Sequence, residues 1–275
     1  MPVTPQLPPR PDLGTRAFPG AAGVPLATTL PDGRPAVTWR WWHALLAYLV
    51  TNLVVAQGLV GGTLVAITGI DIVEGAADGG VLGLTLVTNA VWVTGLVLWL
   101  RRAHPGWRDS IRLVPATRRI REFGVSFAIG LGLYPVVSIG AALIVGMLLQ
   151  ILTDRSVAVP QQIESDLSVA GQIAALGVAL LAAPIAEELF FRGVLFRSIR
   201  DRHGFWPGAL SSSLLFGLGH YVAAPWADAL FLQGVMVVTG VGLCLVYEWR
   251  KSLLSSIAAH VAFNAVGIVL ILTTG

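Results

Sequence analysis

Charged residues are scarce in this chain of 275 residues. Only 12% of them are Asp, Glu, Lys or Arg, whereas soluble globular proteins contain about 25%. Mean hydropathy is correspondingly high, at +0.75, and 55% of the residues are hydrophobic. This composition excludes an ordinary soluble domain and predicts an integral membrane protein.

Cysteine is almost absent as well. The single Cys244 cannot form a disulfide within the chain, and no cysteine-based zinc motif is present. Its apolar neighbours favour a packing role. Walker-type and Rossmann glycine motifs are also missing. The net charge is +3, but the basic residues are spread over short loops, so we do not expect nucleic acid as a partner.

Seven apolar runs are candidate membrane spans, since a spanning helix needs about 20 residues. They cover approximately residues 43–69, 80–100, 123–152, 171–199, 206–222, 229–247 and 252–273. We therefore expect an all-α integral membrane protein with about seven transmembrane helices. Its expected regions are a disordered Pro/Gly-rich tail at 1–38, N-terminal transmembrane helices at 39–169 and a C-terminal four-helix core at 170–275.

The loops between these runs alternate in charge. Arginine or lysine is found in the tail and in the loops after the second, fourth and sixth runs, whereas the other loops are acidic or nearly free of cations. Because positively charged loops stay in the cytosol, the N-terminus is expected there and the C-terminus outside. We expect a multi-pass protein of the plasma membrane, with the lipid bilayer as its surroundings and no obligate protein partner.

Polar residues interrupt three of the last four runs. They form three groups: Glu187, Glu188 and Arg192; Phe216 and His220; and His260 and Asn264. Ionisable residues inside a membrane span are costly and are therefore functional candidates. At about 1.5 Å per helical residue, Glu187, His220 and His260 lie roughly 18, 21 and 12 Å from the ends of their spans. All three are thus near the middle of a core about 30 Å thick, where they can meet.

The spacing within the groups suggests hydrolytic chemistry. Glu188 and Arg192 are i and i+4 residues and can pair, which leaves Glu187 free to face a cavity. A buried glutamate suits a general base, and a histidine with an amide can stabilise an oxyanion. Alternatively, Glu187, His220 and His260 could hold Zn²⁺ or another divalent metal. The H-E-x-x-H motif of zinc peptidases is absent, and the choice stays open.

The three motifs, E-E-x-x-x-R, F-x-x-x-H and H-x-x-x-N in this order, resemble the CPBP family. That family, also called the CAAX-protease or Abi family, includes the type II CAAX prenyl protease. The resemblance covers about residues 170–272 and implies an intramembrane endopeptidase with a catalytic C-terminal core and a peptide or membrane-protein substrate. The residues implied by position are Glu187, Glu188, His220, His260 and Asn264, with Arg192 and Phe216 in support. Glu187 with His220 would activate water. His260 with Asn264 would stabilise the oxyanion.

Two alternatives use the same residues differently. In a non-catalytic membrane binding or immunity protein of the same fold, the polar groups would form structural ion pairs and hydrogen bonds between helices. In a proton-coupled transporter, the buried glutamates and histidines would relay protons. No internal repeat is visible in the sequence, and this absence disfavours the transporter.

Overall fold

The computed structural model describes residues 36–70, 79–113, 118–154, 168–222 and 224–274, and every regular element in these ranges is a helix. The expected all-α fold is confirmed. Six helices in the described ranges are long and apolar enough to cross a membrane: Trp41–Thr68, Gly80–Ala103, Arg119–Thr153, Val169–His203, Trp226–Arg250 and Leu253–Leu270. The disordered tail predicted over residues 1–38 lies outside the described residues, apart from its last three.

The run predicted as a fifth span forms a shorter helix, α10 (Phe205–Leu218). Its length is about 21 Å, which is less than the roughly 30 Å of a bilayer core. α10 starts at a sharp corner because Gly204 adopts a φ of +93°, a conformation that glycine tolerates well. At its other end the backbone turns, and His220 donates its N–H to the carbonyl of Gly217. His220 therefore lies just beyond the helix and not within a full span.

The fourth span is one long helix with local changes in winding. It consists of α7 (Val169–Gly177), η4 (Val178–Ala182), α8 (Ala183–Glu187), η5 (Glu188–Phe196) and α9 (Arg197–His203). Pro184, which has no N–H to donate, lies at the start of α8. The segments η4 and η5 are π-helical, a winding that is rare and frequent at functional sites. They lie on either side of Glu187.

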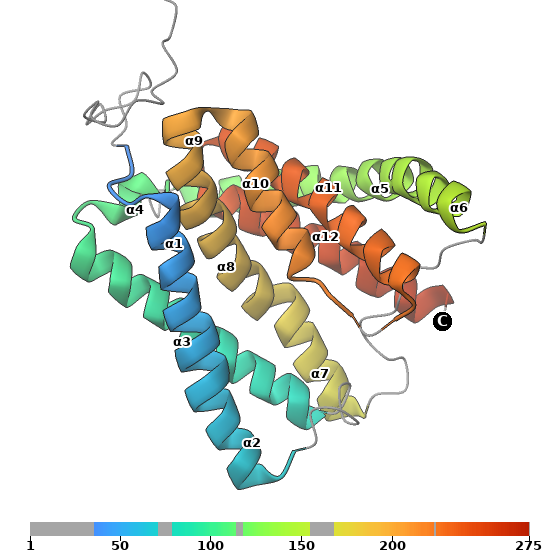
Figure 1. The fold of residues 1–275 in the computed structure, drawn as a ribbon, viewed down its shortest axis with the longest axis horizontal. Helices are drawn as coiled ribbons and strands as arrows, with labels where there is room; N and C mark the ends of the chain where they lie inside the picture. The colour runs from blue at the N-terminus through green and yellow to red at the C-terminus, as the bar shows by residue number, and fades with distance from the viewer. Residues whose placement is uncertain (1–35, 71–78, 114–117, 155–167, 223, 275) are drawn as a thin grey trace, which may run out of the picture.

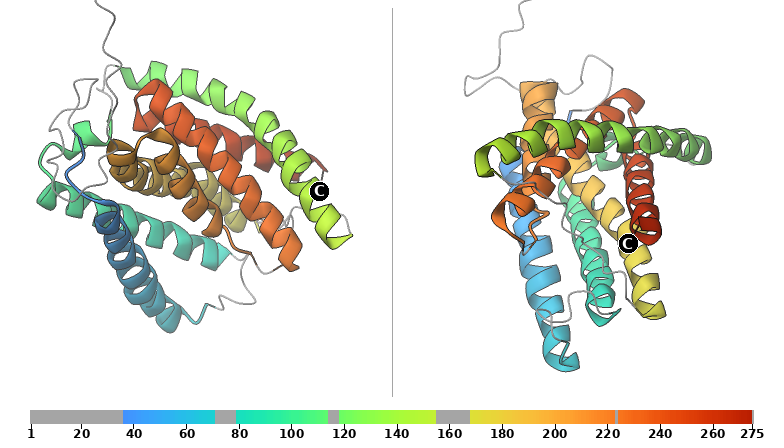
Figure 2. Two further views of the ribbon diagram at one scale, coloured as in Figure 1. Left: turned by 45° about the horizontal axis from the view of Figure 1, so that its top comes forward. Right: turned by 90° about the vertical axis from the view of Figure 1, so that its right-hand side faces the viewer.

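This long helix lies in the middle of the molecule (Figure 1). On one side it contacts the first span, composed of α1 (Trp41–Tyr48), η1 (Leu49–Gly61) and α2 (Gly62–Thr68), and the second, α3 (Gly79–Ala103). On the other side it contacts α10, α11 (Trp226–Arg250) and α12 (Leu253–Thr274). The third span, composed of α5 (Arg119–Ala141), η3 (Ala142–Gly146) and α6 (Met147–Thr153), runs along α11 and α12 (Figure 2). The short helix α4 (Trp107–Ser110) follows α3.

Side-chain donors from both sides bind carbonyl groups of η5. The indole Nε1 of Trp39, which is completely buried, donates to the carbonyl of Val194 at 3.0 Å. The hydroxyl of Ser212 on α10 donates to the carbonyl of Phe191 at 2.8 Å. These bonds satisfy backbone acceptors in a buried segment and fix its position between the two halves of the molecule.

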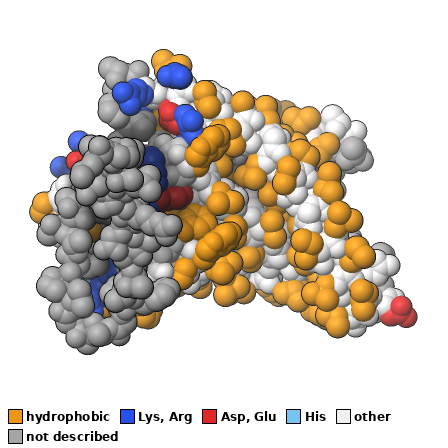
Figure 3. Space-filling model, turned by 90° about the horizontal axis from the view of Figure 1, so that it is seen from above, with side chains coloured by type: hydrophobic (Ala, Val, Ile, Leu, Met, Phe, Trp, Pro, Cys, Tyr) orange, Lys and Arg blue, Asp and Glu red, His pale blue; other side chains and the backbone are white. Residues whose placement is uncertain are grey.

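The surface of the molecule is largely apolar. Ile67 of the first span and Ile120 and Ile151 of the third are at least 75% exposed. Figure 3 shows hydrophobic side chains over a broad area and Lys and Arg gathered toward one end. A soluble monomer rarely exposes apolar patches of this size. The surface therefore fits the lipid contact of a multi-pass membrane protein.

Candidate active site

Glu188 is the centre of a buried polar network. Its side chain is completely buried, and its Oε1 accepts hydrogen bonds from Arg192 Nη1 at 2.7 Å and from His260 Nδ1 at 2.9 Å. Its Oε2 accepts a short hydrogen bond from the hydroxyl of Ser256. The predicted pairing of Glu188 with Arg192 is confirmed. Because both carboxylate oxygens are occupied, Glu188 is suited to hold its neighbours in place.

Glu187 has a different environment, although it is adjacent in the chain. Its side chain is 19% exposed, and its Oε2 lies 3.8 Å from Nε2 of His260. The two nitrogens of His260 therefore face two different carboxylates, with Nδ1 on Glu188 and Nε2 toward Glu187. Because consecutive residues on a helix point about 100° apart, the two carboxylates approach His260 from different directions. Glu187 is thus the more accessible of the two carboxylates.

His220 is held by its own turn of backbone. Its Nδ1 lies 2.8 Å from the carbonyl oxygen of Phe216. Since a carbonyl only accepts hydrogen bonds, Nδ1 carries the proton, and Nε2 of the neutral ring has a lone pair available. No ion pair joins His220 to Glu187 among the described residues. A water molecule or a substrate group would have to bridge them.

The ring of Phe216 packs against three of the polar groups. It is completely buried, and its centroid lies 4.6 Å from the ring of His220 and 5.9 Å from the ring of His260. The guanidinium of Arg192 lies 4.5 Å from the same centroid, within the range of a cation–π contact. Arg192 also donates to the carbonyl of Gly240 on α11. Phe216 thus contacts His220, His260 and Arg192 together.

Asn264 lies one turn beyond His260 on α12. Its Nδ2 donates to the carbonyl of Ala179 in η4 at 2.8 Å. An amide nitrogen has two hydrogens, so this bond orients the side chain and leaves a second donor. The bond also joins α12 to the π-helical part of the long helix.

Two contributions to the site were not anticipated from the sequence. Ser256 is one turn before His260, so that Ser256, His260 and Asn264 lie on one face of α12 at intervals of four residues. Ser256 could have been found in the sequence by counting four residues back from His260, the same interval that separates His260 from Asn264. Tyr48 of α1 interacts with Asn52 and is close enough to Glu187 for an electrostatic effect. No motif signals Tyr48, because it comes from a distant part of the chain.

The donor atoms do not assemble into a metal centre. The described ranges contain no group of three or more His, Cys, Asp or Glu side chains that could hold a metal ion. The predicted set of Glu187, His220 and His260 does not form such a group in these ranges. We therefore derive no step through a metal, and its involvement stays a prediction for chelation experiments.

Comparison with known proteins gives one match. Residues 169–266 match the family model described as type II CAAX prenyl endopeptidase Rce1-like. The matched region begins at α7 and extends into α12, and it contains every residue of the predicted site. No curated protein and no solved structure matches the chain.

Proposed function

We propose that the protein is an intramembrane endopeptidase in which Glu187 is the general base, because residues 169–266 match the Rce1-like family model of type II CAAX prenyl endopeptidases. The observation that supports this assignment is the contrast between the two glutamates. Glu188 is buried with both oxygens bonded, whereas Glu187 is partly exposed and faces an imidazole. A base must reach its substrate, and only Glu187 has this freedom.

His220 is the second group that would hold the attacking water. Its Nδ1–H is used by the carbonyl of Phe216, so its Nε2 accepts a hydrogen bond from water. Glu187 accepts the other proton of the same water, and the two acceptors orient its lone pair toward the substrate carbonyl. The π-helical winding around Glu187 and the early end of α10 would give room for this water.

The charge balance indicates how His260 acts. Its Nδ1 faces an acceptor, the Glu188 carboxylate, so its Nε2 becomes a donor only when the ring is an imidazolium. A positive His260 with Arg192 balances the negative charges of Glu187 and Glu188, which makes the buried cluster neutral. In this state Nε2–H and the second amide hydrogen of Asn264 are donors for an oxyanion.

The proposed hydrolysis balances in atoms and in charge. The water gives a proton to Glu187, and its oxygen forms a bond to the carbonyl carbon. The carbonyl electron pair moves to the oxygen, where His260 and Asn264 stabilise it. When the pair returns, the C–N bond breaks and Glu187 gives its proton to the leaving amine. Glu188, Arg192, Ser256 and Phe216 hold the reacting groups in position.

We propose a peptide segment that lies in or enters the membrane as the substrate. The candidate residues belong to apolar helices, and a scissile bond must reach Glu187 between them. Cleavage of prenylated CaaX termini is the family's named activity, and a membrane or signal peptide is the broader class. We further propose the plasma membrane as the location, with the N-terminus in the cytosol.

The test compares matched pairs of variants. Purified protein in lipid nanodiscs is incubated with a peptide library, and the products are identified by mass spectrometry. Loss of a general base lowers the rate by about 10²- to 10⁴-fold, so we expect this loss in Glu187→Gln. Glu122→Gln, the same change in a carboxylate paired with Arg250, should keep the wild-type rate. His220→Ala is compared in the same way with His203→Ala, which alters an exposed residue at the end of α9.

If Glu187→Gln cleaves peptides as fast as Glu122→Gln does, Glu187 is not the general base. If wild type and all variants fail to cleave any peptide while remaining folded, the non-catalytic alternative gains support.

A further inference from the structure

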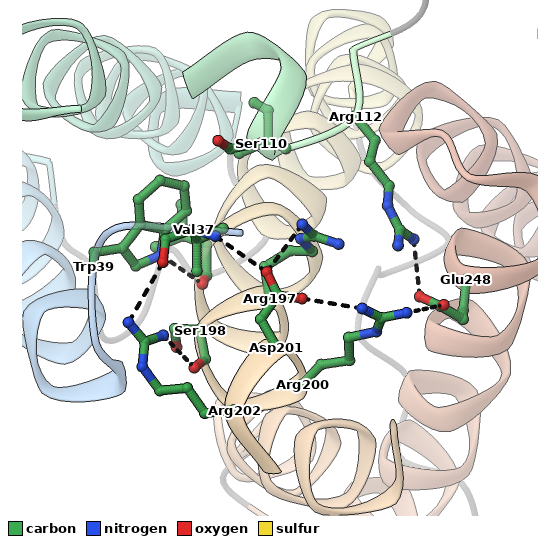
Figure 4. A network of polar contacts seen from close by, with 12 residues as sticks. Val37, Trp39, Ser110, Arg112, Arg197, Ser198, Arg200, Asp201, Arg202 and Glu248 are labelled. Atoms are coloured by element: carbon green, nitrogen blue, oxygen red, sulfur yellow. Dashed lines mark hydrogen bonds and ion pairs between the residues drawn. The ribbon is translucent and has the colours of Figure 1, made fainter. Parts of the chain in front are cut away.

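A second polar network lies at one end of the molecule, apart from the candidate active site. Its members come from the segment after α4, from α9, from the end of α11 and from the turn that follows it. The cations are Arg112, Arg197, Arg200, Arg202 and Lys251, and the carboxylates are Asp201 and Glu248. Figure 4 shows Arg200 between the two carboxylates and Arg112 on the far side of Glu248.

The two carboxylates are shared among several cations. Glu248 pairs with Arg112 at 2.8 Å, Arg200 at 2.5 Å and Lys251 at 2.6 Å. Asp201 pairs with Arg197 at 3.0 Å and Arg200 at 3.2 Å, and it also accepts the backbone N–H of Val37. The seven described members thus contain five cations and two carboxylates. Among these described members positive charges outnumber negative ones, although most of the side chains are shielded from water.

Arg197 has the least complete set of partners. The residue is completely buried, yet none of its three guanidinium nitrogens makes a hydrogen bond with the described residues. Its Nη2 makes only the ion pair with Asp201. The nearby guanidinium of Arg112 repels it. A buried donor without an acceptor is unfavourable, and in folded proteins such a group usually signals a bound water or ion.

The position of the network indicates the kind of anion. Trp206 and Trp249 are next to it in the chain and are 59% and 69% exposed, as expected for rings at a membrane–water boundary. Lipid phosphates lie at this level, and basic pockets between helices bind phosphate headgroups. Guanidinium groups bind phosphate through two parallel N–H donors. Arg200 and Lys251, which are 19% and 37% exposed, give the network a face toward the solvent.

We propose that Arg197 and Arg200, with Lys251 at the rim, form a binding site for a phosphate group, carried by an anionic lipid or by a free phosphate ion. The bound phosphate supplies the acceptors that Arg197 lacks and balances the excess charge. Because this network includes no residue of the candidate active site, the proposal does not depend on proteolysis.

The test measures the thermal unfolding of the full-length protein under three conditions. The protein is placed in nanodiscs of phosphatidylcholine, in nanodiscs of phosphatidylcholine with phosphatidylglycerol, and in phosphatidylcholine with inorganic phosphate added. A ligand that binds only the folded state raises Tm. We expect Tm to rise by a few degrees with phosphatidylglycerol or with phosphate. A rise with the lipid alone identifies a headgroup, and a rise with phosphate alone identifies a free ion.

Two variants locate the site. Arg197→Gln should lose the increase in Tm, and Arg250→Gln should keep it, because Arg250 lies at the same end of the molecule but pairs with Glu122 outside the network. If Arg197→Gln does not fold, Arg200→Gln replaces it with the same expectation. Equal increases in Arg197→Gln and Arg250→Gln would mean a diffuse charge effect and would overturn the proposal. If neither the lipid nor phosphate raises the Tm of the wild type, water alone occupies the network, and the proposal is likewise overturned.

Discussion

The contact between α5 and α12 gives a sharp test of how the candidate active site is positioned. A Cβ at Gly130 of α5 would lie 2.4 Å from the carbonyl oxygen of Ala259, 2.7 Å from its Cα and 2.7 Å from the Cβ of Ala262. Two of these atoms belong to the backbone of α12, so no side chain can rotate away. The substitution Gly130→Ala therefore has to move a helix.

The required displacement follows from these distances. Ordinary van der Waals contact begins near 3.4 Å, so the helices must separate by about 1 Å in a closely packed interior. The displaced helix carries His260, whose bond to Glu188 is 2.9 Å long. A change of about 1 Å exceeds the tolerance of a hydrogen bond. Misplacement of that size lowers catalytic rates by about 10²-fold.

The assay is peptide cleavage per amount of folded protein, together with Tm. We expect Gly130→Ala to lose about 100-fold in kcat. Gly132→Ala is the matched control, because a Cβ at Gly132 meets no atom within 4 Å. In the control, helix propensity favours alanine by about 1 kcal/mol, so its stability should be unchanged or higher. If Gly130→Ala cleaves within threefold of Gly132→Ala at an equal Tm, the position of α12 does not govern activity and the reasoning is refuted.

Two further predictions concern the groups around Glu188 and the question of a metal. Ser256→Ala removes a donor to Glu188 and should lower kcat about 10- to 100-fold at an unchanged KM, since one hydrogen bond to a charged group contributes about 1.5 to 3 kcal/mol. Ser198→Ala, which changes a buried serine that bonds a carbonyl of its own helix, should leave kcat unchanged. A change in KM alone for Ser256→Ala would refute the positioning role. Activity should persist after treatment with 1,10-phenanthroline and EDTA, because the described side chains form no metal ligand set; loss of activity with recovery on adding Zn²⁺ would show that a metal is required.

The sequence was most informative where one helix carries a complete pattern. The pairing of Glu188 with Arg192 follows from their interval of four residues, and it is present in the structure. The helical class and most of the spans follow from apolar runs whose length matches a bilayer. These features depend on local spacing and composition, which a single chain displays directly.

Features that depend on where the backbone turns were predicted less well. Apolar residues continue past Leu218, so the sequence suggested a fifth span that extends to residue 222. In the structure α10 ends at Leu218. The consequence is local: His220 is held by a turn and not by a helix. Composition gives no signal for this end because Gly219 and the residues around it are compatible with either conformation.

The estimated depths indicated that the three polar groups could meet, but the other contacts between distant segments could not be predicted. The approach of Tyr48 to Glu187 joins the first span to the fourth. Hydropathy and spacing describe each helix separately and contain no information on which helices are neighbours. The sharing of Glu248 by Arg112, Arg200 and Lys251 has the same origin, since the sequence displayed these residues only as loop charges that set orientation.

The bond from Trp39 to Val194 has a consequence for the order in which the protein is made. The two residues are 155 positions apart, and ribosomes add about 5 to 20 residues per second, so about 10 to 30 s pass between their synthesis. During this time the indole N–H lacks its carbonyl acceptor, while the first spans are already entering the membrane. Trp39, which precedes the first span, therefore makes this bond only after the fourth span has been synthesised.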